Sequence, residues 1–297
     1  MTTFNRRDFL KGAIGATTAL ATGGMAVAAL AAKKSATDWV TLGNSGIQVT
    51  RLAFGTGTFG GKIQRELGQE NFTKVVRHAY DRGIRFFETA DAYRTQGMLA
   101  TALKGIPRDS YKLMTKFRWK DADNPQAIVD RLRKELNSDY FDILLLHCVR
   151  TTGWSEELKR LRDEVSEIKQ KKIILAHGAS CHGLLPLRSF PGNKWLDVVL
   201  VRINHDGARM DTLAGGDGKE KGDVTEAAAQ IKKIHAHGTG VLGMKLVGEG
   251  QFTTPEQREA SLKFVLGLGA VDAVTIACKN TAEVDEAIER MNRILNA

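Results

Sequence analysis

The feature that most constrains the fold is a repeated alternation of short apolar runs with longer amphipathic segments, beginning near Leu52 and continuing to the end of the chain. The runs have the length of strands, and the segments between them repeat hydrophobic residues with the period of a helix. Strands that are this uniformly apolar are typical of parallel sheets covered by helices. Eight such runs occur, at 52–57, 85–90, 111–117, 141–149, 173–181, 197–204, 240–248 and 273–279.

Eight strand and helix pairs predict an α/β protein with a closed (β/α)8 barrel, also called a TIM barrel. Before the first pair, the turn sequence GNSG at 43–46 separates two alternating segments and predicts an N-terminal β-hairpin. A doubly wound open sheet is the alternative. It is disfavoured because GTGTFG at 55–60 lacks the glycine spacing of a dinucleotide-binding G-x-G-x-x-G. The polar stretch 207–223 is predicted to be a mobile loop at the catalytic end.

The N-terminal segment is expected to be separate from this barrel. NRRDFLK at 5–11 is followed by a mildly apolar run at 12–30 and by small residues at 29–31. This arrangement resembles a twin-arginine (Tat) export signal. It predicts a signal peptide at 1–31 that binds the Tat export machinery, a barrel at 32–297, and an exported, periplasmic location. A membrane anchor or a disordered amphipathic tail is the alternative.

Composition excludes few function classes but narrows the partners. The formal net charge is +9. Lysines and arginines are interspersed with acids, as in KRLRDEVSEIKQKK at 159–172, which favours solvated helix faces over a nucleic-acid-binding stripe. The three cysteines are an odd number at wide spacing. We therefore predict no disulfide framework and at least one free thiol.

Polar side chains end three neighbouring apolar runs. Glu88 ends the second run and Tyr93 lies in the loop after it, while Lys116 and His147 lie near the ends of the third and fourth. In a (β/α)8 barrel the carboxyl ends of the strands form the active site, so these four groups are expected to converge. A tyrosine whose pKa is lowered by a nearby ammonium can protonate a carbonyl oxygen, and a histidine can donate a hydrogen bond to that oxygen.

The segments ETADAY, MTKF and DILLLHC, in this order, resemble the aldo-keto reductase superfamily, and the resemblance covers nearly all of the predicted barrel. It implies that Tyr93 is the proton donor, that Lys116 lowers the pKa of Tyr93, and that His147 orients the carbonyl group. Glu88 stands where the family has aspartate. The resemblance also implies hydride transfer between a nicotinamide cofactor, NADP or NAD, and a small carbonyl or alcohol substrate.

Three further segments resemble the cofactor-binding parts of the family: HGASCH at 177–182, GMKLVGEG at 243–250 and ACKNTAEVDEAI at 277–288. They correspond in turn to the nicotinamide, pyrophosphate and adenosine 2′-phosphate contacts. The resemblance therefore implies six cofactor-binding residues, namely Ser180, Cys181, Lys245, Gly248, Lys279 and Asn280.

The cofactor segments also depart from the family pattern. Cys181 replaces asparagine, Leu200 replaces glutamine, and Ile203 stands near the position of a tyrosine that stacks on the nicotinamide. Val284 and Asp285 stand where an arginine usually holds the 2′-phosphate. The choice between NADP and NAD is therefore open.

Two other functions are compatible with the sequence. Sulfur, imidazole and carboxylate groups near strand ends could form a metal-dependent or redox site, although neither C-x-x-C nor H-x-H spacing occurs. A non-catalytic binding protein on a degenerate reductase barrel is the other alternative. The substrate, the direction of the reaction and the oligomeric state are left open. The residues of the metal alternative are Cys148, Cys181, His182, His205, Asp206 and Cys278.

Overall fold

A computed structural model of the protein describes residues 33–213 and 220–297. The predicted signal peptide at 1–31 and residues 214–219 of the predicted 207–223 loop lie outside this part of the chain. The first two strands of the described part, β1 (Trp39–Thr41) and β2 (Gln48–Thr50), pair antiparallel as the predicted hairpin. No helix in the described ranges has both the length and the apolar character needed to cross a membrane.

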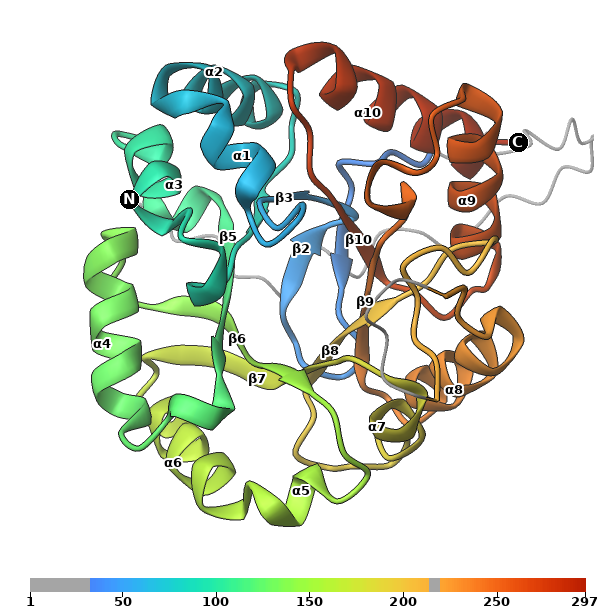
Figure 1. Cartoon of the computed structure of the whole chain (residues 1–297). Coiled ribbons are helices and arrows are strands. Elements are labelled where there is room, and N and C mark those ends of the chain that lie inside the picture. Colours follow the sequence, from blue (N-terminus) through green and yellow to red (C-terminus); the bar gives the residue numbers. More distant parts are fainter. Residues whose placement is uncertain (1–32, 214–219) are drawn as a thin grey trace, which may run out of the picture. The chain divides into compact units, whose positions relative to one another are not determined.

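The hairpin is followed by a closed barrel of eight parallel strands with the order β10-β3-β4-β5-β6-β7-β8-β9 (Figure 1). This confirms the fold predicted from the alternation of apolar runs and helices. The barrel strands are β3 (Leu52–Gly55), β4 (Phe86–Glu88), β5 (Lys112–Arg118), β6 (Phe141–Val149), β7 (Ile174–Cys181), β8 (Val198–Arg202), β9 (Gly240–Met244) and β10 (Ala273–Ile276).

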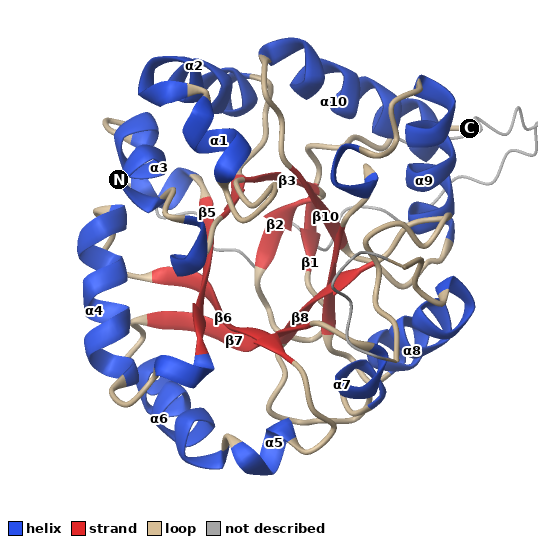
Figure 2. Cartoon of the chain, viewed as in Figure 1, coloured by secondary structure: helices blue, strands red, loops and turns tan. Residues whose placement is uncertain are grey.

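The helices form a ring around the strands (Figure 2). Their inward faces are apolar and pack on the outside of the barrel. Short 3-10 turns, η2 (Asp91–Tyr93), η3 (Arg108–Ser110), η4 (Trp119–Asp121) and η5 (Gly248–Gly250), lie in connecting loops. The helices are α1 (Lys62–Glu66), α2 (Gly68–Asp81), α3 (Gln96–Leu103), α4 (Pro125–Leu136), α5 (Trp154–Glu157), α6 (Lys159–Gln170), α7 (Leu184–Arg188), α8 (Val224–Ala236), α9 (Pro255–Gly267) and α10 (Thr281–Leu295).

The β1–β2 hairpin closes one end of the barrel. Leu42 and Val49 belong to the same apolar cluster as the inward-facing residues of the barrel strands, such as Phe86. The backbone N–H of Asn44 donates to the carbonyl of Gly238, which precedes β9, at 2.7 Å. The hairpin therefore covers the amino-terminal ends of the strands, and the carboxyl ends are left to form the site.

Candidate active site

A buried ion pair joins β4 and β5 at the carboxyl end of the barrel. The ammonium of Lys116 contacts the Glu88 carboxylate and also donates to the backbone carbonyl of Thr89 at 2.8 Å. The side chains of Lys116 and Glu88 are 0% and 4% exposed. Because both charges are buried, each depends on the other for compensation.

Tyr93 of η2 lies beside this pair. The Lys116 ammonium is 4.9 Å from the centre of the Tyr93 ring, and the His147 ring of β6 meets the tyrosine edge-on at 5.5 Å between ring centres. A Cβ added to Gly57 would lie 2.6 Å from ring carbons of Tyr93, so only glycine gives the phenol this position. The structure therefore brings together all four predicted catalytic side chains.

The pKa of Tyr93 differs from the prediction. Burial raises the pKa of the phenol well above its ordinary value, and the nearby Glu88 carboxylate raises it further. The predicted net lowering of this pKa is wrong, because burial of the phenol, the largest cause, and the Glu88 carboxylate together raise it. Tyr93 is consequently held in its protonated form.

His147 is held as a neutral imidazole. Burial lowers its pKa well below the ordinary value, and the positive charges of Lys116 and Arg118 lower it further. Its Nδ1 atom is buried and has no hydrogen-bond partner among the described residues. A neutral imidazole retains one N–H donor, which suits it to a carbonyl oxygen better than to an anion.

A buried polar network lies next to His147, and its arginine and aspartate were not predicted as functional. Arg202, at the end of β8, pairs with Asp211 at 3.2 Å and donates to His182 Nδ1 at 2.7 Å. His182 Nε2 lies 3.1 Å from the Cys148 sulfur. The sequence held one signal for this network: Arg202 directly follows the apolar residues 198–201.

The two residues expected to hold the nicotinamide are buried and have contacts within the protein. Ser180 and Cys181 are both fully buried at the end of β7. The Ser180 hydroxyl accepts a hydrogen bond from the backbone N–H of Cys148 at 3.0 Å, and the Cys181 sulfur lies 3.9 Å from an Asp211 oxygen. These two side chains support the neighbouring loops instead of lining a cavity.

Two cavities meet at the carboxyl end of the barrel. The tyrosine cavity, of about 70 Å³, is lined by Glu88, Tyr93 and Lys245 among others. The helix cavity, of about 430 Å³, lies between η5, α9 and α10. The two are neighbours that share five lining residues, namely Thr58, Val247, Glu249, Ile276 and Ala277. One of them lies at Tyr93 and the other extends between the helices.

The four remaining predicted cofactor residues have different positions. Lys245 lines the tyrosine cavity and donates to Glu249 at 2.7 Å, whereas Gly248 lines neither cavity. Lys279 lines the helix cavity and pairs with Glu283 at 3.4 Å. The Asn280 side chain caps α10 by accepting from the Glu283 N–H at 2.9 Å.

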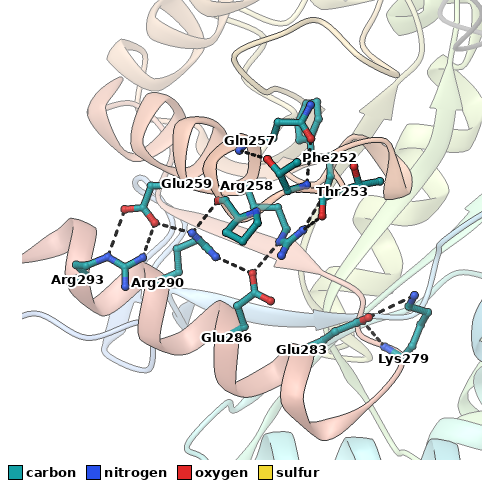
Figure 3. Close-up of polar contacts among 12 residues, drawn as sticks. Phe252, Thr253, Gln257, Arg258, Glu259, Lys279, Glu283, Glu286, Arg290 and Arg293 are labelled. Atoms are coloured by element: carbon teal, nitrogen blue, oxygen red, sulfur yellow. Dashed lines mark hydrogen bonds and ion pairs between the residues drawn. The ribbon is translucent and has the colours of Figure 1, made fainter.

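The walls of the helix cavity carry a row of alternating charges on α9 and α10 (Figure 3). Arg258 donates to Glu286 at 2.7 Å. Arg290 donates to the same carboxylate at 2.7 Å and to Glu259 at 2.6 Å. Figure 3 also shows Lys279 turned toward its carboxylate partner on α10. Each of these cations is therefore already paired within the protein.

The positions that lack the family's usual residues have structural roles. Val284 is buried in the core, and Asp285 accepts from His78 of α2 at 2.8 Å and pairs with Arg82 at 2.6 Å. Leu200 and Ile203 are buried as well. At these four positions the side chains are therefore engaged within the protein, three by burial and Asp285 by its polar partners.

The groups considered for a metal site are mostly apart. All three cysteines, which lie in the described ranges, are free thiols, so the prediction of a free thiol is confirmed. His205 packs on Phe252 and Asp206 pairs with Lys221. Within residues 33–213 and 220–297, no three His, Cys, Asp or Glu side chains are grouped so that they could hold a metal ion.

The sequence pattern of the Aldo/keto reductase family matches residues 51–296. The chain belongs to this family. Probable aldo-keto reductase 1 of Glycine max is 29% identical to it over 155 residues, which are 47% of this chain and 45% of that protein. The aligned part covers less than half the length of the curated relatives that this aldo/keto reductase matches.

Solved structures of other family members share the fold of this aldo/keto reductase. One from Pseudomonas aeruginosa is 20% identical, covers 89% of this chain and 98% of its own, and gives a TM-score of 0.68. One from Klebsiella pneumoniae, in complex with NADP and acetate, is 14% identical, covers 87% and 90%, and gives a TM-score of 0.61. At these identities the likeness shows the barrel alone.

The buried ion pair of this aldo/keto reductase leads to a stability prediction. Glu88→Ala leaves the Lys116 ammonium buried without its partner and should lower the free energy of unfolding by about 3–5 kcal/mol. Glu88→Asp keeps the charge and should cost much less. Urea denaturation of the three proteins measures the difference.

The double variant Glu88→Ala/Lys116→Met is the control, because it removes both charges and should recover part of the lost stability. A Glu88→Ala protein as stable as the wild type would contradict the assignment of Glu88 as the compensating charge.

Proposed function

We propose that this aldo/keto reductase transfers a hydride between a nicotinamide cofactor and a small carbonyl or alcohol substrate. The observation that carries the proposal is the convergence of Tyr93, His147 and the Lys116–Glu88 pair beside one cavity. A phenol held in its acid form, next to a neutral imidazole and a fixed ammonium, is suited to protonating a carbonyl oxygen.

The side chains have distinct parts in the reduction. When bound, the nicotinamide supplies the hydride for the carbonyl carbon. The Tyr93 hydroxyl donates the proton that the carbonyl oxygen takes up, and the neutral His147 ring donates a hydrogen bond that orients this oxygen. Lys116, fixed by Glu88, places a positive charge next to the phenolate that forms on Tyr93, so that charge is stabilised as it develops.

The cavities fit a long anionic cofactor in part. The tyrosine cavity is lined by Lys245, and the neighbouring helix cavity by Lys279 and by arginines of α9 and α10, so the two together offer cations to a dinucleotide's phosphates. The NADP in the Klebsiella pneumoniae relative supports a dinucleotide here. Ser180 and Cys181 do not line the space, and Lys279 is paired with Glu283, so titration with NADP and with NAD is needed to find the preferred cofactor.

The catalytic part of the proposal is tested by Tyr93→Phe. The variant loses only the hydroxyl proton, so kcat for reduction of an aromatic aldehyde should fall about 10²- to 10⁴-fold. Nucleotide affinity should change little. Stopped-flow and steady-state absorbance at the nicotinamide band measure both quantities.

The matched control is Tyr140→Phe, which removes a phenol whose ring packs on Arg108 at 4.0 Å, remote from the predicted catalytic side chains. It should keep full activity. Equal turnover of Tyr93→Phe and the wild type would rule out Tyr93 as the acid.

The raised pKa of Tyr93 predicts the pH dependence. The phenol is the acid in reduction, and a pKa above the ordinary value of about 10 keeps it protonated through neutral and mildly alkaline pH. The reduction rate should therefore stay flat from about pH 6 to pH 9, with no inflection near pH 6.5 from His147.

Alcohol oxidation needs the phenolate and should accelerate with pH over this range. A profile of kcat/KM in both directions tests this; an alkaline loss of reduction below pH 9 would contradict it.

We also propose that the chain is exported through the twin-arginine pathway, on the basis of NRRDFLK at 5–11. Replacing both arginines, Arg6→Lys and Arg7→Lys, should keep the protein in the cytoplasm, as measured by fractionation and immunoblotting. The control is the reverse exchange at a nearby pair, Lys33→Arg and Lys34→Arg, which should leave export unchanged. Export of the Arg6→Lys/Arg7→Lys variant at the wild-type level would contradict the proposal.

A non-catalytic binding protein is the second candidate, favoured by the burial of Ser180 and Cys181 away from both cavities. An exported reductase must keep its nucleotide bound, because a free nicotinamide pool is not expected outside the cytoplasm. Protein from the exported fraction should be denatured and its supernatant assayed for NADP and NAD. Absence of nucleotide, together with no binding when either is added back, would favour this second candidate.

A further inference from the structure

The carboxylate of Glu249 gathers donors from three separate loops at the mouth of the barrel. It accepts from the Lys245 ammonium at 2.7 Å and from the backbone N–H of Phe59 at 3.0 Å, and it pairs with Arg209 at 3.5 Å. These residues follow β9, β3 and β8 respectively. We call these four residues the Glu249 strap. It connects loops that are far apart in the sequence.

The strap is built on strained backbone. Phe59, Arg209, Lys245 and Glu249 have φ values of 48°, 59°, 70° and 55°. Residues with a Cβ rarely adopt this left-handed conformation, and they hold it only where surrounding contacts fix it. Three of these residues contact the fourth, Glu249, which indicates that the central carboxylate helps to hold the loops in this arrangement.

Glu249 lies where the two cavities join. It lines both the tyrosine cavity and the helix cavity, and its side chain is only 11% exposed. Lys245 pairs with it here and Arg209 carries a second positive charge. Any ligand that spans from Tyr93 to the helices α9 and α10 must pass this carboxylate.

We propose that Glu249 is an internal anion that competes with the pyrophosphate of the dinucleotide for Lys245, Arg209 and the Phe59 N–H, and so sets cofactor affinity. This inference rests on the dinucleotide of the proposed function, whose pyrophosphate lies between its two ends. A pyrophosphate and a carboxylate are both bound by ammonium, guanidinium and backbone N–H donors. They cannot share this junction, because their negative charges repel.

The competition predicts the direction in which cofactor affinity changes when the charge of Glu249 is removed. Binding of the cofactor must displace Glu249 from its donors, and the three strained loops are then free to rearrange around the new anion. Removing the charge of Glu249 leaves Lys245 and Arg209 available without that exchange. An alternative role, in which Glu249 ties the loops together over the bound cofactor, predicts the opposite effect on affinity.

The test is the affinity of inorganic pyrophosphate for the full chain, measured by isothermal titration calorimetry. Glu249→Gln keeps the size of the side chain and removes its charge, so pyrophosphate should bind roughly 10- to 100-fold more tightly than to the wild type. NADP and NAD should also bind to Glu249→Gln more tightly and associate faster than with the wild type. The fluorescence of the protein's tryptophans follows their binding.

Two further variants keep the test decisive. Glu66→Gln removes an exposed carboxylate that pairs with Lys62 on α1 and lines neither cavity, so it should leave pyrophosphate binding unchanged. Arg209→Gln removes a donor and should weaken pyrophosphate binding. Thermal unfolding of each protein shows whether it is folded, and Arg209→Gln tests the inference if Glu249→Gln does not fold.

The outcomes separate this inference from the proposed function. Unchanged or weaker pyrophosphate binding in a folded Glu249→Gln protein overturns the inference, even if NADP or NAD supports carbonyl reduction. An equal gain in Glu66→Gln also overturns it, because the effect is then one of general charge. Tighter pyrophosphate binding in Glu249→Gln alone supports the inference, even if no carbonyl compound is reduced.

Discussion

The geometry of the site depends on the buried pair of Lys116 and Glu88. Its two charges come from adjacent barrel strands, and neither side chain has appreciable contact with solvent. An ammonium in this position is tolerated only because a carboxylate compensates it, and the pair in turn fixes the face of the barrel on which Tyr93 packs. Burial of the phenol, and after it the Glu88 carboxylate, raises the pKa of Tyr93 and keeps this residue in its acid form.

The sequence was sufficient to place the predicted catalytic side chains because of a simple rule of the fold. In a parallel barrel, polar residues that end apolar strands must meet at one end, so Lys116 and His147 could be located from the pattern of strands alone. The hairpin was equally readable from its turn residues at 43–46. Gly57 was not identified, although its contact with Tyr93 is as restrictive as any of these, because a glycine in a loop has many possible reasons.

The remaining parts of the site depend on contacts that local sequence does not encode. Ser180 and Cys181 match a motif, yet their side chains turn into supporting contacts with the neighbouring loops. Glu249 gave no signal of its own, because its partners come from three loops between 59 and 249. The pKa of Tyr93 was predicted in the wrong direction for a related reason: burial and the orientation of Glu88 are properties of the folded chain.

The carboxylate at position 88 is packed together with the glycine at position 55. A Cβ on Gly55 would lie 3.1 Å from a Glu88 oxygen and 2.6 Å from the hydroxyl of Thr275, which itself donates to that carboxylate at 3.4 Å. A side chain at residue 55 would therefore press on the Thr275 hydroxyl and also on the Glu88 carboxylate. Any residue larger than glycine at 55 would require these two hydrogen-bonded groups to shift together, so a change on β3 would be felt directly by the partner of Lys116.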